Sequence, residues 1–227
     1  MSSRHAERAL PVASLSKLMV ALLLVQQPQL LEQNSRVSAR AAAATGARAG
    51  LREGQSYRVP DLLSAMLVRS ANDACLALAE HVAGSVEAFV AGMNRAAALL
   101  DLRETQFENP CGWDAPRQRS SARDVMRLAR LAMGYPQIRE RVAMREFELQ
   151  SADGRLRTPL RNTNLLLEQL PGTVGVKTGF TAQAGKCLVV LVEREGREVW
   201  LVLLGAEERW WTAHRAIESA LRDAPRG

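Results

Sequence analysis

The sequence predicts an α/β (α+β) fold in which an antiparallel sheet is flanked by helices and the middle of the chain is rich in helix. Three observations lead to this prediction. The uninterrupted apolar run Leu18–Val25 is typical of a buried helix near the N-terminus. Helical patterns of apolar residues then dominate the middle of the chain, at about 28–150. Three strand-like apolar runs follow near the C-terminal end.

Each element is expected from its own pattern of apolar residues. Helical spacing predicts helices at about 14–27, 60–68, 72–83, 85–100, 121–133 and 208–222. Apolar and alternating runs predict strands at about 174–180, 185–194 and 197–206. The pair Asp153-Gly154 predicts a β-hairpin within 142–170. Because 227 residues suffice for one globular unit with a substantial core, we expect a single domain over 1–227.

Ser14-Leu15-Ser16-Lys17 stands where the first helix begins. Lys17 lies three residues after Ser14, so the two side chains share a helix face. A serine nucleophile needs a base within hydrogen-bond reach, and a lysine can be that base only if its pKa falls. Burial, the helix macrodipole and a second cation all lower a lysine pKa, and Lys177 is the candidate cation. The structural alternative is a helix cap at Ser14 and a solvated Lys17.

Two further strings contain polar groups of the right chemistry. Ser70-Ala71-Asn72 lies between two helical patterns, where serine and asparagine commonly act as caps. In the catalytic interpretation, the Ser70 hydroxyl relays a proton, and the Asn72 amide binds the substrate carbonyl and Lys17. Lys177-Thr178-Gly179 lies on a strand-like run, where it presents a cation and a hydroxyl suited to a carboxylate. Gly179 lets another backbone approach closely. The structural alternative there is an ordinary surface strand.

Each string is weak alone, because S-x-x-K arises by chance in many proteins. The three strings occur in one order, 56 and then 107 residues apart, and together they match the signature of the penicillin-interacting serine enzymes. A phosphate-loop interpretation of 172–178 is rejected, because no glycine directly precedes Lys177 and no helical pattern follows.

The chain resembles the low-molecular-mass penicillin-binding proteins, the serine D-alanyl-D-alanine carboxypeptidases, from about Leu10 to Leu221. Beyond the three strings, the likeness extends to Gly50–Gln55, Ser70–Ala74, Ala79–Gly84, Asn109–Trp113, Arg161–Leu166 and Phe180–Gly185. The resemblance implies the β-lactamase/transpeptidase-like fold. It also implies an enzyme that needs no cofactor and no metal.

The resemblance further implies acyl transfer in two steps. Ser14 would attack the penultimate D-Ala carbonyl of a peptidoglycan stem peptide, D-Ala would leave, and water would hydrolyse the ester. β-Lactams would acylate Ser14 because they imitate the D-Ala-D-Ala end. The implied catalytic residues are Ser14, Lys17, Ser70 and Asn72, with an oxyanion hole formed by the N–H groups of Ser14 and Phe180. The implied substrate-binding residues are Lys177, Thr178, Gly179, Phe180 and Arg161.

Three alternatives stay open. Residues 158–164 and 177–189 look most like the periplasmic endopeptidase branch of the family, which cuts the D-Ala–diaminopimelate cross-bridge. A β-lactamase is disfavoured, because no Glu-x-x-Leu-Asn-like string lies between Asn72 and Lys177. A non-catalytic wall-binding relative, made inactive by truncation, is the third alternative.

The N-terminus departs from the family pattern. Only 13 residues precede Ser14, whereas family members carry a signal peptide and the first strands of the sheet there. We therefore expect these strands to be missing and the strand at 197–206 to be an exposed apolar edge that favours self-association. The run Leu18–Val25 is too short for a transmembrane span. The resemblance implies a periplasmic location, with no signal peptide in this chain.

Composition excludes other classes of protein. The net charge is +6, but no basic stripe interleaved with aromatics appears, so no nucleic-acid partner is expected. Cys75, Cys111 and Cys187 form no C-x-x-C pair, so the sequence indicates neither a zinc site nor a disulfide framework, and we expect core thiols at Cys75 and Cys187. The three histidines lie far apart and predict no metal site.

Overall fold

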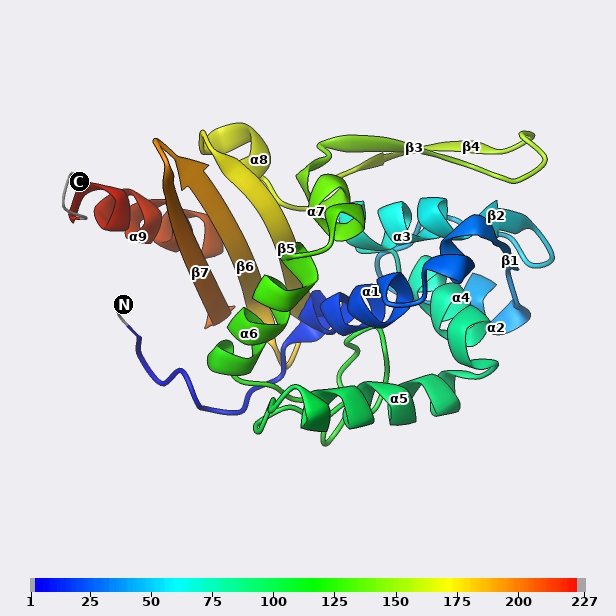
Figure 1. Ribbon diagram of the computed structural model, residues 1–227, viewed down its shortest axis with the longest axis horizontal. Helices are drawn as coiled ribbons and strands as arrows, with labels where there is room; N and C mark the ends of the chain where they lie inside the picture. Colours follow the sequence, from blue (N-terminus) through cyan, green and yellow to red (C-terminus); the bar gives the residue numbers. More distant parts are fainter. Residues whose placement is uncertain (1–2, 224–227) are drawn as a thin grey trace.

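The computed structural model describes residues 3–223. Its elements form two parts that lie side by side, a sheet with helices on both faces and a group of helices around the N-terminal helix α1 (Lys17–Val25) (Figure 1). This is the expected mixture of helices and antiparallel sheet. The first long helix, α1 (Lys17–Val25), follows a short 3-10 turn, η1 (Ala13–Ser16).

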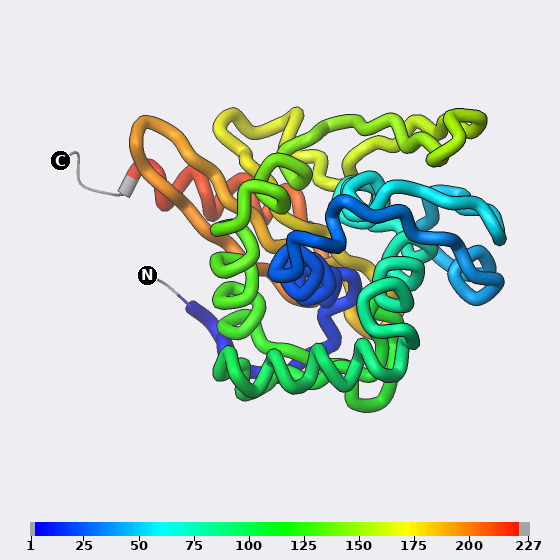
Figure 2. The backbone as a smooth tube through the Cα atoms, turned by 45° about the vertical axis from the view of Figure 1, so that its right-hand side comes forward, coloured from blue at the N-terminus to red at the C-terminus, as the bar shows by residue number. Residues whose placement is uncertain are grey.

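The helix α1 is buried at every position except Leu23, because its sequence is apolar on all faces. Figure 2 shows α1 nearly end-on, surrounded by the other helices. These include α3 (Val59–Val68), α4 (Asn72–Ala83), α5 (Val86–Leu99), α6 (Ala122–Met133) and α7 (Pro136–Ala143). The polar residues at the start of α1 are thereby carried into the interior.

The main sheet has the strand order β5 (Thr173–Thr181), β6 (Gly185–Arg194) and β7 (Arg197–Ala206), all antiparallel. The central strand β6 is buried on both faces. One face of the sheet packs on η1, α6 and α7, and the other packs on α9 (Arg209–Asp223). Because β5 lies against η1, the third string of the sequence is placed beside the first.

The outer edge of β7 pairs with no strand within residues 3–223. The side chains of β7 are mostly half-buried, since Trp200, Val202 and Leu204 pack toward the main core while Leu201 and Leu203 pack toward α9. The expectation of an apolar edge strand is therefore confirmed for the described part of the chain.

The expected helices and strands are all present, with bounds that differ by a few residues. The hairpin around Asp153-Gly154 is present as β3 (Glu146–Gln150) and β4 (Arg157–Arg161). The helix α7 was not predicted. The same holds for five short elements, η2 (Pro28–Glu32), β1 (Asn34–Arg36), α2 (Ala39–Ala42), β2 (Ser56–Arg58) and α8 (Leu166–Gln169). Segments of three to five residues are too short to show a period.

The expectation that Cys75 is a core thiol is wrong, and the structure contains a disulfide that the cysteine pattern did not indicate. Cys75 on α4 is bonded to Cys111, which lies 36 residues further on in the loop between α5 and α6. The spacing of the two cysteines carries no signal, because the fold alone brings them together. Cys187 is free and buried, as expected for a core thiol.

Within residues 3–223, no individual helix has both the length and the apolar character needed to cross a membrane. The helices α4 and α5 meet the criterion only as a pair bent by 83°, on length and composition alone.

Candidate active site

Ser14 and Lys17 lie one turn apart at the junction of η1 and α1. The Nζ atom of Lys17 is 2.9 Å from the Oγ atom of Ser14. The residue before the serine, Ala13, has a φ of 49°, in the left-handed region that non-glycine residues rarely adopt. The predicted contact between a hydroxyl and an amine is therefore present, at a strained turn.

Lys17 is fully buried. Its Nζ donates hydrogen bonds to Oδ1 of Asn72 at 2.8 Å and to the backbone carbonyl of Cys111 at 2.6 Å. Burial, followed by the positive charge of Lys177, lowers the pKa of Lys17 well below its ordinary value, while the carboxylate of Asp73 opposes the shift. A neutral amine has two N–H bonds, and both have acceptors here. The lone pair of such an amine is left for the Ser14 hydroxyl.

Asn72 is held at the first turn of α4. Its Nδ2 donates to the carbonyl of Thr45 at 2.6 Å, and its backbone N–H donates to the carbonyl of Ala47 at 2.7 Å. These bonds direct Oδ1 toward Lys17. The predicted hydrogen bond between Asn72 and Lys17 is confirmed.

Asp73, which the sequence analysis did not single out, fixes the loop between α2 and β2. Its buried carboxylate accepts hydrogen bonds from the backbone N–H groups of Ala49, Gly50, Leu51 and Ala74, at 2.9–3.1 Å. Its negative charge also reaches Lys17. An aspartate in the first turn of a helix gives no sequence signal of this kind, because helix N-termini commonly carry one.

Lys177 reaches the second string from β5. Its Nζ donates to Oγ of Ser70 at 2.8 Å and to its neighbour's carbonyl, that of Thr178, at 3.0 Å. Ser70 has a φ of 62°, again in the left-handed region. Burial, followed by the charge of Arg209, lowers the pKa of Lys177 to about 7. The Ser70 hydroxyl thus contacts Lys177, and the three strings meet in one place.

Gly179 allows β5 to approach the nucleophile. A Cβ atom at this position would lie 2.9 Å from Cβ of Ala13 and 3.1 Å from the backbone nitrogen of Ser14. The adjacent Thr178 hydroxyl lies 2.6 Å from that of Thr163, and the side chain of Phe180 is 66% exposed. The strand therefore brings its backbone to Ser14 while it leaves an apolar side chain at the surface.

The structure does not bring Arg161 into this group. Its side chain is exposed on β4 and pairs with Glu146 across the hairpin. A different arginine, Arg209 at the start of α9, donates to the carbonyls of Gly179 and Cys187, both at 2.9 Å. No local motif surrounds Arg209, and only the packing of α9 on the sheet places it behind β5.

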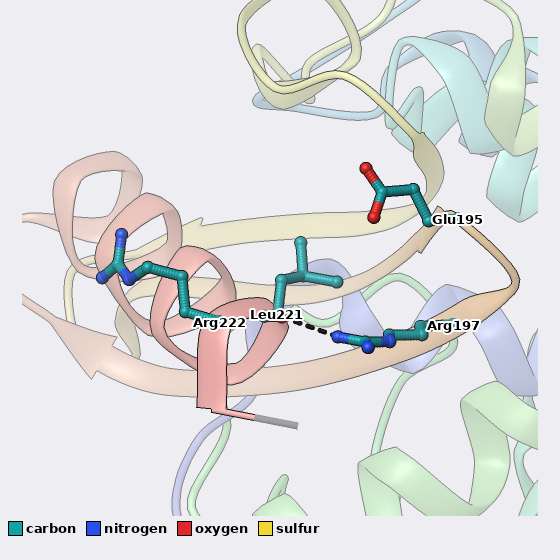
Figure 3. Close-up of a pocket in the computed structure, with 4 residues that line it drawn as sticks. All are labelled: Glu195, Arg197, Leu221 and Arg222. Atoms are coloured by element: carbon teal, nitrogen blue, oxygen red, sulfur yellow. Dashed lines mark hydrogen bonds between the residues drawn. The ribbon is translucent and has the colours of Figure 1, made fainter. Parts of the chain in front are cut away.

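A surface cavity lies away from the three strings. A cavity of about 560 Å³ is lined by Glu195, Arg197, Leu221 and Arg222, at the β6–β7 turn and the end of α9 (Figure 3). Over the described residues, no three His, Cys, Asp or Glu side chains gather into a group that could hold a metal.

Comparison with known proteins identifies a family and individual relatives that are similar to this chain. The family model described as D-alanyl-D-alanine carboxypeptidase matches residues 1–208. The chain is 32% identical over 208 residues to the D-alanyl-D-alanine carboxypeptidase DacF of Bacillus subtilis, covering 90% of this chain and 53% of that protein. It is 31% identical over 222 residues to the D-alanyl-D-alanine endopeptidase of Escherichia coli, covering 97% of this chain and 71% of that protein. The chain thus spans about half the length of the Bacillus relative.

Solved structures share the fold. A serine-to-alanine variant of the Streptomyces K15 DD-transpeptidase superposes with a TM-score of 0.90 at 28% sequence identity. The match covers 96% of this chain and 90% of that one. The arrangement of helices and sheet described above is therefore a transpeptidase fold.

Proposed function

The chain belongs to the D-alanyl-D-alanine carboxypeptidase (peptidase S11) family, and from this membership we propose that it is a serine peptidase that removes D-Ala from peptidoglycan stem peptides. The observation that carries the proposal is the 2.9 Å contact between Nζ of Lys17 and Oγ of Ser14, in a buried setting that lowers the lysine pKa. A hydroxyl beside a neutral amine is an activated nucleophile.

In the proposed reaction, Ser14 attacks the carbonyl of the penultimate D-Ala, and its proton passes to Lys17. The two acceptors that hold the N–H groups of Lys17, Asn72 and the Cys111 carbonyl, keep the lone pair on the serine. In the proposed second proton transfer, Lys17 gives its proton to the leaving amine through the Ser70 hydroxyl, which is oriented by a hydrogen bond from Lys177. Water attacks the ester in the second step and releases the shortened peptide.

The substrate-binding side is supported by the position of β5. The N–H groups of Ser14 and Phe180 form the proposed oxyanion hole, and the close approach at Gly179 supports their pairing. Lys177 and Thr178 bind the terminal carboxylate of the substrate. The half-buried Arg209 adds positive charge behind the strand, in the role that the sequence assigned to Arg161.

Endopeptidase activity on the D-Ala–diaminopimelate cross-bridge is the second candidate. It is supported by the likeness to the Escherichia coli endopeptidase, which extends over 97% of this chain. The same catalytic groups serve both reactions. Mass spectrometry of digested muropeptides separates them, because a carboxypeptidase removes one D-Ala and an endopeptidase converts dimers to monomers.

The disulfide supports a location outside the cytoplasm, in line with the cell-envelope location of the family. Disulfides persist in oxidising compartments such as the periplasm and are rare in the cytosol. The proposed partners are peptidoglycan stem peptides and β-lactams. A second copy of the chain, pairing along the exposed edge of β7, is also proposed, and a monodisperse monomer at high concentration in gel filtration would contradict that pairing.

Labelling with a fluorescent penicillin tests the nucleophile. The wild-type protein is expected to form a covalent adduct, and Ser14→Ala is expected to form none. Ser16→Ala is the matched control, because Ser16 lies in the same turn but points to Gln118 and the Ala13 carbonyl. Failure of the wild type to label, with the chain folded, would favour a non-catalytic wall-binding relative.

A further inference from the structure

The disulfide joins the two chain segments that hold Lys17. Cys75 lies on α4 one turn after Asn72, and Cys111 lies in the loop 109–113. Asn72 supplies one acceptor for Lys17 through its side chain, and Cys111 supplies the other through its backbone carbonyl. The disulfide therefore links the two segments that contact Lys17. One of its cysteines lies one helical turn from Asn72, and the other is Cys111 itself.

The loop 109–113 is otherwise held at its ends. Oδ1 of Asn109 accepts hydrogen bonds from the N–H groups of Gly112 and Trp113, and Gln118 bonds to the backbone of Asn109. At Gly112 the loop touches the backbone of Ala13, since a Cβ there would lie 1.9 Å from that carbonyl oxygen. The side chain of Cys111 makes its own link to α4.

We propose that the Cys75–Cys111 disulfide is a positioning device for Lys17, which fixes the Cys111 carbonyl against Nζ and keeps the loop closed over the buried amine. The proposal rests on the proposed role of Lys17 as the base for Ser14. Cys75 and Cys111 are in this view positioning residues, and neither touches the substrate.

The physical consequence concerns the proton affinity of Lys17. The charged groups that face Lys17 are Lys177 on β5 and Asp73 on α4, and neither belongs to the loop. Burial is the largest cause of the lowered pKa, so a loop that opens and admits water raises it. A higher pKa leaves less neutral amine, and a displaced carbonyl no longer orients the lone pair.

A lysine titration by NMR tests this without reference to activity. The chain has three lysines, Lys17, Lys177 and Lys186, so labelling with lysine carrying carbon-13 at Cε gives three signals. Lys17→Met assigns one of them. All proteins carry Cys187→Ala, which removes the free thiol, and this background is the reference. In Cys75→Ala/Cys111→Ala the Lys17 signal is expected to titrate about one pH unit higher, a tenfold change in proton affinity. An unchanged or lower pKa overturns the proposal.

Penicillin acylation supplies the second readout. The double variant is expected to acylate at least roughly tenfold more slowly, because ångström-scale misplacement of a catalytic group can lower a rate by about 100-fold. The acid limb of its pH–rate profile is expected to move to higher pH. A variant that only unfolds at lower urea concentration, with the rate and profile of the reference, shows a merely structural disulfide and overturns the proposal.

Reduction of the reference protein is the second perturbation, should the double variant fail to fold. Dithiothreitol in mild urea breaks the S–S bond; each cysteine sulfur gains a proton, and the two reagent thiols close to a cyclic disulfide. The reduced protein, returned to buffer, is expected to show the same shifts, and reoxidation is expected to reverse them. If the oxidised protein itself fails to label, the proposed function fails, while the NMR titration still decides the positioning role.

Discussion

Lys177 is expected to make the stability of the protein depend on pH. Its pKa of about 7 in the folded protein lies below the ordinary value of 10.5 that it regains on unfolding. Between these values the unfolded chain binds more protons than the folded one, so the free energy of unfolding rises with pH. Replacing Lys177 with methionine, an apolar residue of similar length, removes this contribution.

The size of the effect follows from the two pKa values. From pH 7 to pH 9 the unfolded chain keeps its proton on Lys177, while the folded protein goes from half to almost fully deprotonated. The difference integrates to about 1.7 pH units, and at about 1.36 kcal/mol per unit the wild type gains about 2 kcal/mol through Lys177. The gain fades below pH 7 and is absent about one pH unit below it, where the folded protein also keeps the proton.

Urea unfolding at pH 7 and pH 9 measures this difference directly. The wild type is expected to gain about 2 kcal/mol more than Lys177→Met between the two conditions. Lys17 does not mask the effect, because loss of the Lys177 charge raises the pKa of Lys17 and thereby only widens the difference. Lys186→Met, at an exposed site on β6, is the matched control and should keep the wild-type gain. Equal gains in wild type and Lys177→Met would refute the argument that this ammonium is destabilised by burial.

Three further predictions concern Lys17 and the charged residues near Lys17 and Lys177. Lys17→Met is expected to lower the penicillin acylation rate by about 100-fold or more, as loss of a general base does, while circular dichroism shows an intact fold. Asp73→Asn is expected to lower the free energy of unfolding by about 3 kcal/mol in urea melts, because an NH₂ group then faces backbone donors. The same variant is expected to shift the acid limb of the acylation pH–rate profile to lower pH, since Asp73 raises the pKa of Lys17. Arg209→Ala is expected to raise the pKa of Lys177 above 7 in an NMR titration, whereas Arg161→Ala leaves it unchanged; equal effects would contradict the placement of Arg209 behind β5.

The sequence predicted a contact where the types of residue and their spacing along the chain both pointed to it. Ser14 and Lys17 meet because a helix brings residues three apart onto one face, and the apolar run that follows them predicts their burial. Asn72 and Lys177 were singled out by their motifs, and the fold then brought Asn72 to Lys17 and Lys177 to Ser70.

The contacts that the sequence did not predict depend on tertiary packing. The acceptor at Cys111 is a backbone carbonyl, and a backbone group has no residue type to recognise. Arg161 and Arg209 illustrate the same limit, since both are arginines near a motif or a helix start. Only the packing of α9 against the sheet decides that the second reaches β5.

The wide separation of the groups around the buried amine has a consequence for folding. Its partners lie 3, 55 and 94 residues away along the chain, and the contact between the second lysine and Ser70 spans 107 residues. Closing such long loops is an unfavourable step that only the assembled core offsets, so the cluster forms only once the segments that supply its residues have packed together. Under the proposed function, covalent labelling by a β-lactam is therefore expected to report that the segments from Ser14 to Lys177 have reached their native topology, and it can serve as a probe of a late stage of folding.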